Sequence, residues 1–419
     1  MPLIGNAIAL RQPRHVLFDW FITQQQAFGG DTYEISAPWL PAAVVISRPE
    51  NIEFVLKNES RISRGRFVAT RTWDLFGYGI INATGSLARL QREVARSFFA
   101  GENVDALITT VLPEAYSSTT RATLAHHAQT NEPLDLQRTL LDLTTEAVSA
   151  MVYDSGAATS VSPRFSHALD YASDEIGRRF QNPLYPLTEL FTSAKLRAAV
   201  EEVKATGARI IHRARKRRAR EAFASLCDNT EPQFDSLLDL LIDTLGGGSS
   251  SSNPTTLVAD SALNFLYAAR DTTAQWISWT VYAVVHDSDA LARVLAEIST
   301  LPPPDQLQPA DLGASRLPYT TAVLHEALRL YPPVPLQIKH LPPHTLVIWC
   351  VWAINRSAAL WGDDAHHFRP ARWLDEDGQQ FQRDGKSAWE FPVFGGGAAA
   401  ARGCVGKAMA EAMAAWVLP

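Results

Sequence analysis

Cysteine is scarce in this sequence: 419 residues include only Cys227, Cys350 and Cys404. Scattered cysteines in odd number do not form the framework of a disulfide-stapled protein, and they fit a reducing compartment in which at most one thiol has a special task. Long apolar runs are also missing, since none reaches the length of about 18 residues that a membrane span needs. The first residues lack the basic start and apolar stretch of a secretory signal. The sequence therefore predicts neither a transmembrane segment nor a secretory leader.

Neither sign of charge dominates the chain. Lys plus Arg is 38 and Asp plus Glu is 44, a net charge of −6, which argues against a protein whose whole surface binds nucleic acid. The only strongly basic run is RARKRRAR at 213–220. A helix with such a face can contact anionic lipid, but a solvated helix face is the favoured interpretation. With 46% apolar residues, the chain has enough material for a globular core.

Hydrophobic spacing predicts a mainly helical protein with a small sheet near the N-terminus. We expect strands at 32–36 and 42–47, and short strands around 345–351. The glycine- and serine-rich stretch 246–254 is interpreted as a flexible surface loop, and the proline-rich last third as irregular coil. Helices are predicted at 14–28, 87–100, 133–153, 193–224, 234–245, 255–285 and 288–300.

Cys404 occupies the most informative position in the sequence. A glycine-rich coil runs into a segment at 406–416 that favours helix, so the thiol is expected at a helix N-terminus. Backbone N–H groups and the helix dipole favour a thiolate there, and Arg402 adds positive charge, which suits an axial metal ligand or a nucleophile. The neighbouring glycines allow a flat cofactor to approach the backbone. Taken alone, a buried inert cysteine is an equally good interpretation.

The same segment resembles the haem-binding loop of the cytochrome P450 family. Phe394 and Gly397 match the start of the family pattern, and Arg402, Cys404 and Gly406 match its end. Four alanines at 398–401 stand where the family has one residue. The resemblance implies that Cys404 is the iron ligand of haem b and that the other four residues bind the cofactor.

Two further motifs share the order and spacing of that family. Glu326 and Arg329 lie three apart on a predicted helix in HEALR and can pair on one face; this resembles the family's Glu-x-x-Arg helix. The segment FRPARW is similar to the family's second arginine motif, which implies that Arg372 completes a network with Glu326 and Arg329 that braces the haem loop. The alternative is a surface ion pair, which contributes little to stability.

The predicted helix 255–285 carries AARDTTA at its middle, between apolar turns. A threonine hydroxyl can bond to the carbonyl one turn back and distort the helix, which opens a niche for oxygen and water. The motif resembles the family's oxygen-activation motif, which implies that Thr272 donates a hydrogen bond to dioxygen and that Asp271 supplies protons through water. The alternative is a capped or kinked structural helix.

Arg92 belongs to LARLQREVARSFF, which resembles the family's third helix. It aligns with the arginine that binds a haem propionate, and its rigid fork suits a carboxylate. Ala88 stands where an aromatic partner is usual. An exposed helical arginine is the alternative.

The resemblance as a whole implies one cytochrome P450-like domain over residues 1–419, a mainly α fold with a small N-terminal β-sheet. Haem b would lie between the helix 255–285 and the helix after Cys404. Three segments, GYGIINATG, RRFQNPLYPLTELF and AARDTTA, look most like the microsomal fatty-acid and alkane hydroxylase branch, particularly its fungal members. By this resemblance the chain lacks the N-terminal anchor and the C-terminal strands.

The function implied is monooxygenation: one oxygen atom from O2 enters a small apolar substrate such as a fatty acid, an alkane or a secondary metabolite. No flavin or iron–sulfur motif occurs, so electrons are expected from a separate NADPH-dependent reductase. The implied location is the cytosolic face of the endoplasmic reticulum with peripheral membrane contact; a soluble cytoplasmic location stays open.

Other interpretations are weaker or remain as rivals. A zinc-protease HExxH helix fails because Arg329 occupies the fifth place, and a phosphate loop at ARGCVGKA fails at Ala401 and Ala408. The adjacent histidine pairs at 126–127 and 366–367 are poor metal pairs. Two rivals stay open: a degenerate haem-fold protein without turnover, and a helical interaction scaffold that takes up no haem.

Overall fold

The computed structural model describes residues 4–38, 40–59, 62–153, 162–225, 236–246, 254–341, 345–382, 386–396 and 402–418. Gly397 and the alanine run at 398–401 lie outside the described residues, as does nearly all of the loop predicted at 246–254.

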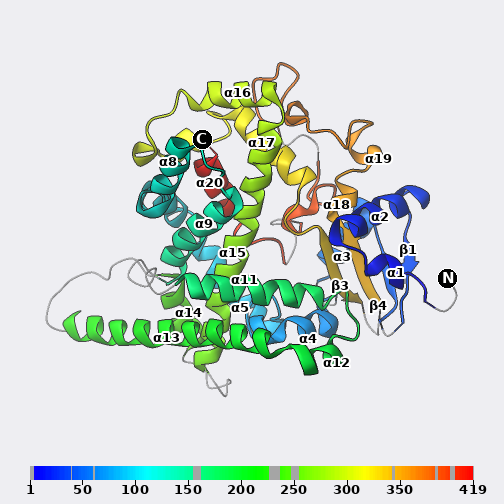
Figure 1. Cartoon of the computed structure of the whole chain (residues 1–419), viewed down its shortest axis with the longest axis horizontal. Coiled ribbons are helices and arrows are strands. Elements are labelled where there is room, and N and C mark those ends of the chain that lie inside the picture. The colour runs from blue at the N-terminus through cyan, green and yellow to red at the C-terminus, as the bar shows by residue number, and fades with distance from the viewer. Residues whose placement is uncertain are drawn as a thin grey trace.

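Helices make up most of the molecule, and a small sheet lies at one side of them (Figure 1). The mainly helical class expected from the sequence is confirmed. The helices are α1 (Ala7–Leu10), α2 (Arg14–Ala27), α3 (Pro49–Lys57), α4 (Gly65–Phe76), α5 (Gly85–Phe98), α6 (Glu102–Ala106), α7 (Leu112–Ala115), α8 (Arg121–Thr130), α9 (Leu136–Tyr153), α11 (Pro163–Arg178), α12 (Tyr185–Thr192), α13 (Ala194–Ser225), α14 (Leu237–Leu245), α15 (Pro254–Val285), α16 (Ser288–Ile298), α17 (Pro318–Leu330), α18 (Val351–Ile354), α19 (Ala358–Trp361) and α20 (Lys407–Val417).

The predicted helices are all present, with ends that differ by a few residues. The sequence reading missed two π-helical segments, Leu107–Val111 and Tyr116–Thr120, which continue the helical path from α6 to α8. Short 3-10 turns at Pro304–Gln306, Pro309–Leu312, Pro370–Trp373 and Pro392–Phe394 each begin at a proline. A proline is tolerated there because the first turn of a helix needs no N–H donor.

The sheet has four strands in the order β1-β2-β4-β3. The strands are β1 (Tyr33–Ile35), β2 (Ala43–Val45), β3 (Leu336–Leu341) and β4 (Thr345–Cys350). β1 pairs antiparallel with β2, β2 parallel with β4, and β4 antiparallel with β3. The two early strands confirm the prediction, but half of the sheet comes from the last third of the chain.

The expectation of irregular coil is wrong for β3. Pro335 lies just before this strand, and Pro342 directly follows its last residue, so neither ring removes a donor from inside the ladder. β4 supplies the reason for pairing: five of its six side chains are buried, and such an apolar strand is stable only when its backbone is paired and both faces are covered.

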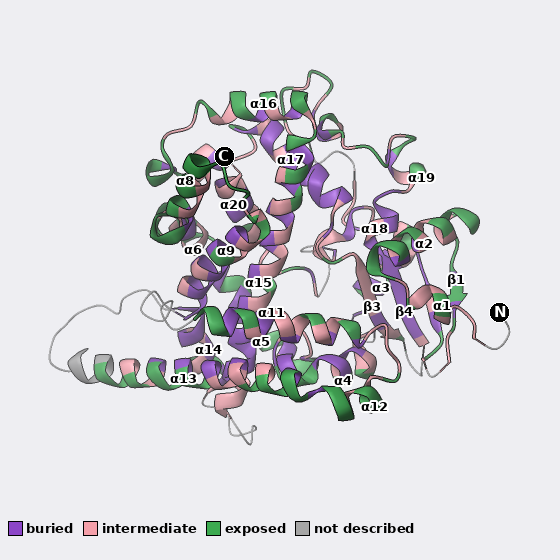
Figure 2. Cartoon of the chain, in the orientation of Figure 1, coloured by how far each residue is buried: buried purple, intermediate pink, exposed green. Residues whose placement is uncertain are grey.

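α15 runs through the middle of the helical part and is packed on several sides by α9, α13, α14, α17 and α20. Every residue from 258 to 266 is buried, as expected for a helix surrounded by other elements. Figure 2 shows the same arrangement, with burial concentrated on the inner helices and α13 exposing its outer face.

Polar side chains in this buried part of α15 hold the loop at 77–82. Asp260 Oδ2 accepts a hydrogen bond of 3.0 Å from the Tyr78 N–H, and Asn264 Oδ1 accepts one of 3.1 Å from the Ile81 N–H. A side chain at Gly79 would collide with Asn264, since a Cβ there would lie 2.0 Å from that amide. The glycine is therefore needed for the close approach, and the approach places the next residues at the central cavity.

The basic run 213–220 lies on α13, and the interpretation of a purely solvated face needs correction. Arg217 donates to Asp239 at 2.6 Å, Arg218 to Asp243 at 2.6 Å and Arg215 to Thr255 at 2.8 Å. The half-buried arginines thus join α13 to α14 and to the start of α15, while Arg213, Lys216 and Arg220 are exposed. The single domain over residues 1–419 stays a prediction.

Candidate functional site

A cavity of about 290 Å³ lies between α5, α15, α17, α20 and the β3–β4 hairpin. Its wall is apolar over most of its area, and charged groups gather in one part of it. The apolar residues of the wall include Leu56, Ile80, Ile81, Phe99, Phe265, Ala268, Ala269, Trp276, Leu328, Val334, Val393, Phe394, Val405, Met409 and Met413.

Cys404 opens onto this cavity just before α20. It is the exposed one of the two cysteines that the structure describes, whereas Cys350 is buried. The Cys404 N–H donates a 2.8 Å hydrogen bond to the Phe394 carbonyl, so the two ends of the glycine-rich loop meet. Gly395 and Gly396 make this turn with φ of 64° and 83°, a backbone region that favours glycine. The loop that contains the alanine run is closed at its base.

The thiol is less acidic than its position at a helix start suggests. Burial raises the pKa of Cys404 above its usual value, although the Gly406 N–H, Arg92 and Lys407 act in the opposite direction. Arg92 thus supplies the positive charge that sequence reasoning assigned to Arg402. A bound metal ion deprotonates a coordinating thiol outright, so a raised pKa is compatible with a metal ligand.

The other predicted loop residues surround the sulfur. Phe394 lines the cavity, and its ring makes an edge contact with Trp276 at a centroid distance of 6.3 Å. Gly406 also lines it, and a Cβ there would meet no atom within 4 Å, which leaves a face open to a flat group. Arg402 contributes to the wall and donates to the Ala83 carbonyl at 3.2 Å. The predicted Gly397 lies outside the described residues.

Four cations share one part of the cavity wall, here called the cationic wall: Arg64, Arg92, Lys339 and Arg402. The predicted Arg92 donates to the Gly403 carbonyl, and its Nε is buried with no partner among the described residues. Sequence reasoning missed Arg64 and Lys339, because they meet only when β3 lies beside the start of α4.

One carboxylate, Glu59, balances part of the charge of the cationic wall. Lys339 Nζ forms a buried ion pair with its Oε1, while its Oε2 has no donor among the described residues. Burial lowers the pKa of Lys339 to about 8, although Glu59 acts against that shift. Burial also lowers the pKa of Arg64 and of Arg92 to about 10 each. Burial is the largest cause of each shift, and the charge of neighbouring arginines adds to it.

The threonines of the AARDTTA motif face the cavity from α15, and the acid does not. Thr272 lines the cavity and donates to the Ala268 carbonyl at 2.6 Å, which is the predicted bond to the preceding turn. The predicted distortion is not found, since α15 is α-helical throughout. Thr273 also lines the cavity, and its hydroxyl has no partner among the described residues.

Asp271 is turned toward α11. Its Oδ1 accepts a 2.6 Å hydrogen bond from Arg270 Nη1, which also contacts Asp170 at 2.6 Å. Burial raises the pKa of the Asp271 carboxyl, and Arg270 limits that shift. The acid is therefore a half-buried ion-pair member next to the cavity wall and not part of the wall.

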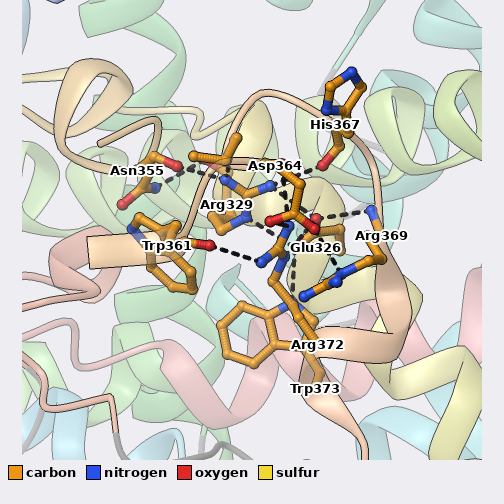
Figure 3. A network of polar contacts seen from close by, with 10 residues as sticks. Glu326, Arg329, Asn355, Trp361, Asp364, His367, Arg369, Arg372 and Trp373 are labelled. Atoms are coloured by element: carbon orange, nitrogen blue, oxygen red, sulfur yellow. Dashed lines mark hydrogen bonds and ion pairs between the residues drawn. The ribbon is translucent and has the colours of Figure 1, made fainter. Parts of the chain in front are cut away.

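Glu326, Arg329 and Arg372 form the network that the sequence predicts (Figure 3). Arg329 binds both carboxylate oxygens of Glu326 at 2.8 Å, and Arg372 Nε reaches Oε1 at 3.0 Å. Glu326 and Arg329 are fully buried, so the alternative of a surface pair is excluded. Trp373 Nε1 donates to the same carboxylate at 2.9 Å, a partner that the sequence motifs did not indicate.

The network ties a long loop to α17. Arg329 donates to the carbonyls of Asn355 at 2.5 Å, Ala365 at 2.6 Å and His367 at 3.1 Å. Arg372 donates to the Trp361 carbonyl at 3.1 Å. These carbonyls belong to coil or helix ends and accept from no other group among the described residues, and buried backbone groups must be paired. In this part of the chain the guanidinium groups of the two arginines thus donate the hydrogen bonds that backbone N–H groups donate in helices and sheets.

The cavity combines features that fit haem b: an exposed cysteine sulfur, an apolar wall, glycine backbone with open space above it, and a cationic wall with unpartnered nitrogen. A sequence profile of the family described as "Cytochrome P450" matches residues 1–419. The chain belongs to this family. As a cytochrome P450 it binds haem b and is a monooxygenase, an oxidoreductase that uses O2, an organic substrate and a redox partner.

Relatives and a solved structure agree with that assignment. The chain is 28% identical to cytochrome P450 94A1 of Vicia sativa over 98% of this chain and 80% of that one. It is also 28% identical to cytochrome P450 monooxygenase cyp1 of Mycosarcoma maydis over 90% of this chain and 62% of that one. The fold is similar to that of retinoic acid-bound cyanobacterial CYP120A1, with a TM-score of 0.74, 19% identity, and coverage of 99% and 88%.

Replacing the Glu326 carboxylate tests how much the network contributes to the free energy of unfolding of this P450. Glu326→Ala leaves two buried guanidinium groups without their anion, so we expect the free energy of unfolding to fall by about 3–5 kcal/mol. Urea denaturation followed by circular dichroism measures the change. The control is Glu53→Ala, which removes an exposed i,i+4 pair with Lys57 and is expected to cost less than about 1 kcal/mol. Equal small losses in both variants would contradict the assigned role.

Haem affinity is expected to depend on the charge of Lys339. Its pKa of about 8 means that the ammonium form, which attracts a carboxylate, is present below that pH and lost as pH rises through it. Lys339→Arg keeps the charge, so the ratio of wild-type Kd to variant Kd should rise between about pH 7 and 9.

Haem titration of the apoprotein at each pH provides the measurement. The ratio removes the separate pH dependence of the Cys404 thiol, which both proteins share. Lys57→Arg, on the surface of α3, is the matched control and should follow the wild type. A flat ratio for Lys339→Arg would show that this charge does not act on haem.

Proposed function

We propose that this P450 hydroxylates an apolar organic substrate of the fatty-acid or alkane type. The observation that carries the proposal is the placement of Cys404 and Thr272 on one cavity whose remaining wall is mostly apolar. Two further facts support it: the sequence segments that resemble the fatty-acid and alkane hydroxylase branch, and the retinoic acid, an apolar carboxylic acid, in the similar solved structure.

Haem, when bound, supplies the chemistry of oxygen insertion, and the protein holds and orients it. Cys404 would hold the haem iron as its thiolate ligand, and a thiolate would donate electron density to that iron. The Phe394 carbonyl holds the cysteine backbone, while the cationic wall attracts the carboxylate edge of the cofactor. The apolar wall excludes water from the substrate.

Thr272 and Asp271 are proposed to handle protons. The Thr272 hydroxyl now donates to the Ala268 carbonyl, and a rotation about χ1 redirects it toward dioxygen in the cavity. Asp271 lies one residue away; burial raises the pKa of its carboxyl, and its ion-pair partner Arg270 limits that shift. Water would have to connect the two groups, because Asp271 itself does not line the cavity.

Electrons are proposed to come from an NADPH-dependent reductase. The given sequence contains no flavin or iron–sulfur motif, which supports delivery by a separate protein. Location at the cytosolic face of the endoplasmic reticulum is proposed with it. Among the described residues, no helix is both long and apolar enough to cross a bilayer.

α12 is the proposed site of peripheral membrane contact. Leu184, Leu187, Leu190 and Phe191 lie on one side of this short helix at helical spacing, and Phe191 is 89% exposed. A contiguous apolar patch of this kind is rare on a fully solvated surface. A lipid bilayer suits it, since the side chains are large and apolar.

Turnover tests the proposed reaction. With a microsomal NADPH reductase and dodecanoic acid, the haem-loaded chain should form a hydroxylated acid. Thr272→Ala should lower the product formed per NADPH by about tenfold or more, as expected when a positioned proton donor is lost. Product analysis by mass spectrometry and NADPH absorbance give the two quantities.

The reduced carbon-monoxide spectrum separates loss of turnover from loss of the site. The wild type and Thr272→Ala should both give the red-shifted Soret band of thiolate ligation, and Cys404→Ser should lose it. Cys350→Ser is the matched control, because Cys350 is buried in the sheet. A wild-type band typical of thiol or histidine ligation would favour the degenerate haem-fold protein instead.

Membrane contact predicts a lipid-binding defect without loss of haem. The double variant Leu190→Ser with Phe191→Ser should bind phosphatidylcholine vesicles at least about tenfold more weakly, because apolar burial drives such binding. Vesicle sedimentation measures bound protein. Phe54→Ser removes an exposed aromatic side chain from α3 and should bind like the wild type. Unchanged binding of the double variant would contradict the assignment of α12.

A further inference from the structure

One face of the β3–β4 hairpin forms a wall of the cavity. In the antiparallel register Gln337 lies opposite Trp349 and Lys339 opposite Val347. Residues two apart on a strand, and residues directly opposite across strands, project from the same face of a sheet. Gln337, Lys339 and Trp349 therefore share one face, and all three line the cavity. The aromatic ring and the ammonium group are diagonal neighbours on that face.

The Trp349 indole has an unused donor. The side chain is 1% exposed, and its Nε1 has no hydrogen-bond acceptor among the described residues. Buried indole N–H groups usually have a partner, because leaving one without an acceptor is unfavourable. An acceptor supplied by a molecule in the cavity would satisfy this donor.

The surroundings of Trp349 select an anionic acceptor. Four positive side chains of the cationic wall face one negative one, Glu59, so the described groups leave a surplus of positive charge. Glu59 already accepts from Lys339, and its second oxygen has no donor, so it does not reach the indole. A carboxylate of the cofactor fits both the charge and the donor.

α5 offers fewer donors to such a carboxylate than the sequence motif of this helix suggests. Ala88 is buried and has no polar side-chain atom, so of the expected aromatic and arginine pair only Arg92 remains. Gln91, the nearest other amide on the helix, is committed to the Tyr78 carbonyl and the Ser261 hydroxyl at 2.9 Å each. A donor from another element is needed to replace the missing one.

We propose that Trp349 is a haem-binding residue whose indole N–H donates to a haem carboxylate, a contact supplied from the sheet in place of the one that Ala88 cannot make. Lys339, on the same face of the hairpin, contributes charge to that carboxylate while Glu59 keeps the ammonium group in position. The proposal rests on haem binding by this P450 and is independent of which substrate it oxidises.

The decisive comparison uses haem and haem dimethyl ester, in which both carboxylates are esterified. Trp349→Phe keeps an aromatic ring and removes the N–H. We expect the Kd for haem to rise about tenfold in this variant, the scale for loss of a hydrogen bond to a charged acceptor. The Kd for the dimethyl ester should differ little between variant and wild type. Absorbance titration of each apoprotein gives all four values.

A matched control accounts for the lost volume of the indole. Trp352 follows β4 by two residues, has an unpartnered Nε1 as well, and does not line the cavity. Trp352→Phe should leave both affinities close to those of the wild type. An equal loss of haem and ester affinity in Trp349→Phe would mean that the ring only packs against the cofactor, and unchanged haem affinity would also overturn the proposal.

A measurement on the unaltered protein covers the case in which Trp349→Phe does not fold. The apoprotein, with its tryptophans labelled with 15N, is loaded with zinc protoporphyrin or with its dimethyl ester. The indole proton of Trp349 should resonate further downfield with the free acid, because a carboxylate acceptor deshields it. Identical indole spectra for the two porphyrins would refute the contact. Activity plays no part in this readout, so failure of the proposed hydroxylation leaves the result unaffected.

Discussion

The buried carboxylate of Glu326 is the group on which the packing of residues 355–373 against α17 depends. It accepts from two arginine side chains, from the Trp373 indole and from the Arg369 backbone N–H. Buried charge of this kind is stable only with a complete set of partners. The partners in turn hold carbonyls between residues 355 and 367, where regular structure is sparse. The coil that precedes the cysteine loop is therefore positioned by polar contacts to α17, and its Trp373 indole donates to the same carboxylate.

The local features of this site could be predicted from sequence, and the long-range ones could not. Cys404, Arg402 and Gly406 lie within five residues of chain, so one motif identifies them. Glu326 and Arg329 lie on one helical turn, and the arginine of a second motif joins them. Lys339 and Glu59 are 280 positions apart, and no local pattern indicates that β3 reaches the region before α4. No sequence motif indicated Trp349 either, because the feature that singles it out is the indole Nε1 without a hydrogen-bond acceptor among the described residues, which only the folded chain shows.

Asp271 illustrates how a motif can identify a residue without indicating where its side chain lies. The helical period places Thr272 toward the cavity, and an adjacent residue on a helix points about 100° away. Arg270, the residue before Asp271, is fully buried between α9 and α11. Its ion pair with Asp271 therefore draws the Asp271 carboxylate toward those helices. The motif predicted the residues, and the neighbouring helices determined where the carboxylate lies. The same division applies to the sheet: β1, β2 and β4 were predicted from sequence, whereas β3 and the pairing of the strands were not.

The hydrogen bond between the Cys404 N–H and the Phe394 carbonyl bears on two properties of the haem loop, its length and the position of its sulfur atom. The bond closes the loop at its base, so the cysteine backbone is held by a residue that precedes the alanine run. The entropy of closing a loop grows only slowly with its length, by about 0.6 kcal/mol for a doubling. Extra residues between Phe394 and Cys404 therefore add little to the free energy of closing this loop, and loop length alone is a poor guide to whether a sequence of this kind has retained its metal centre.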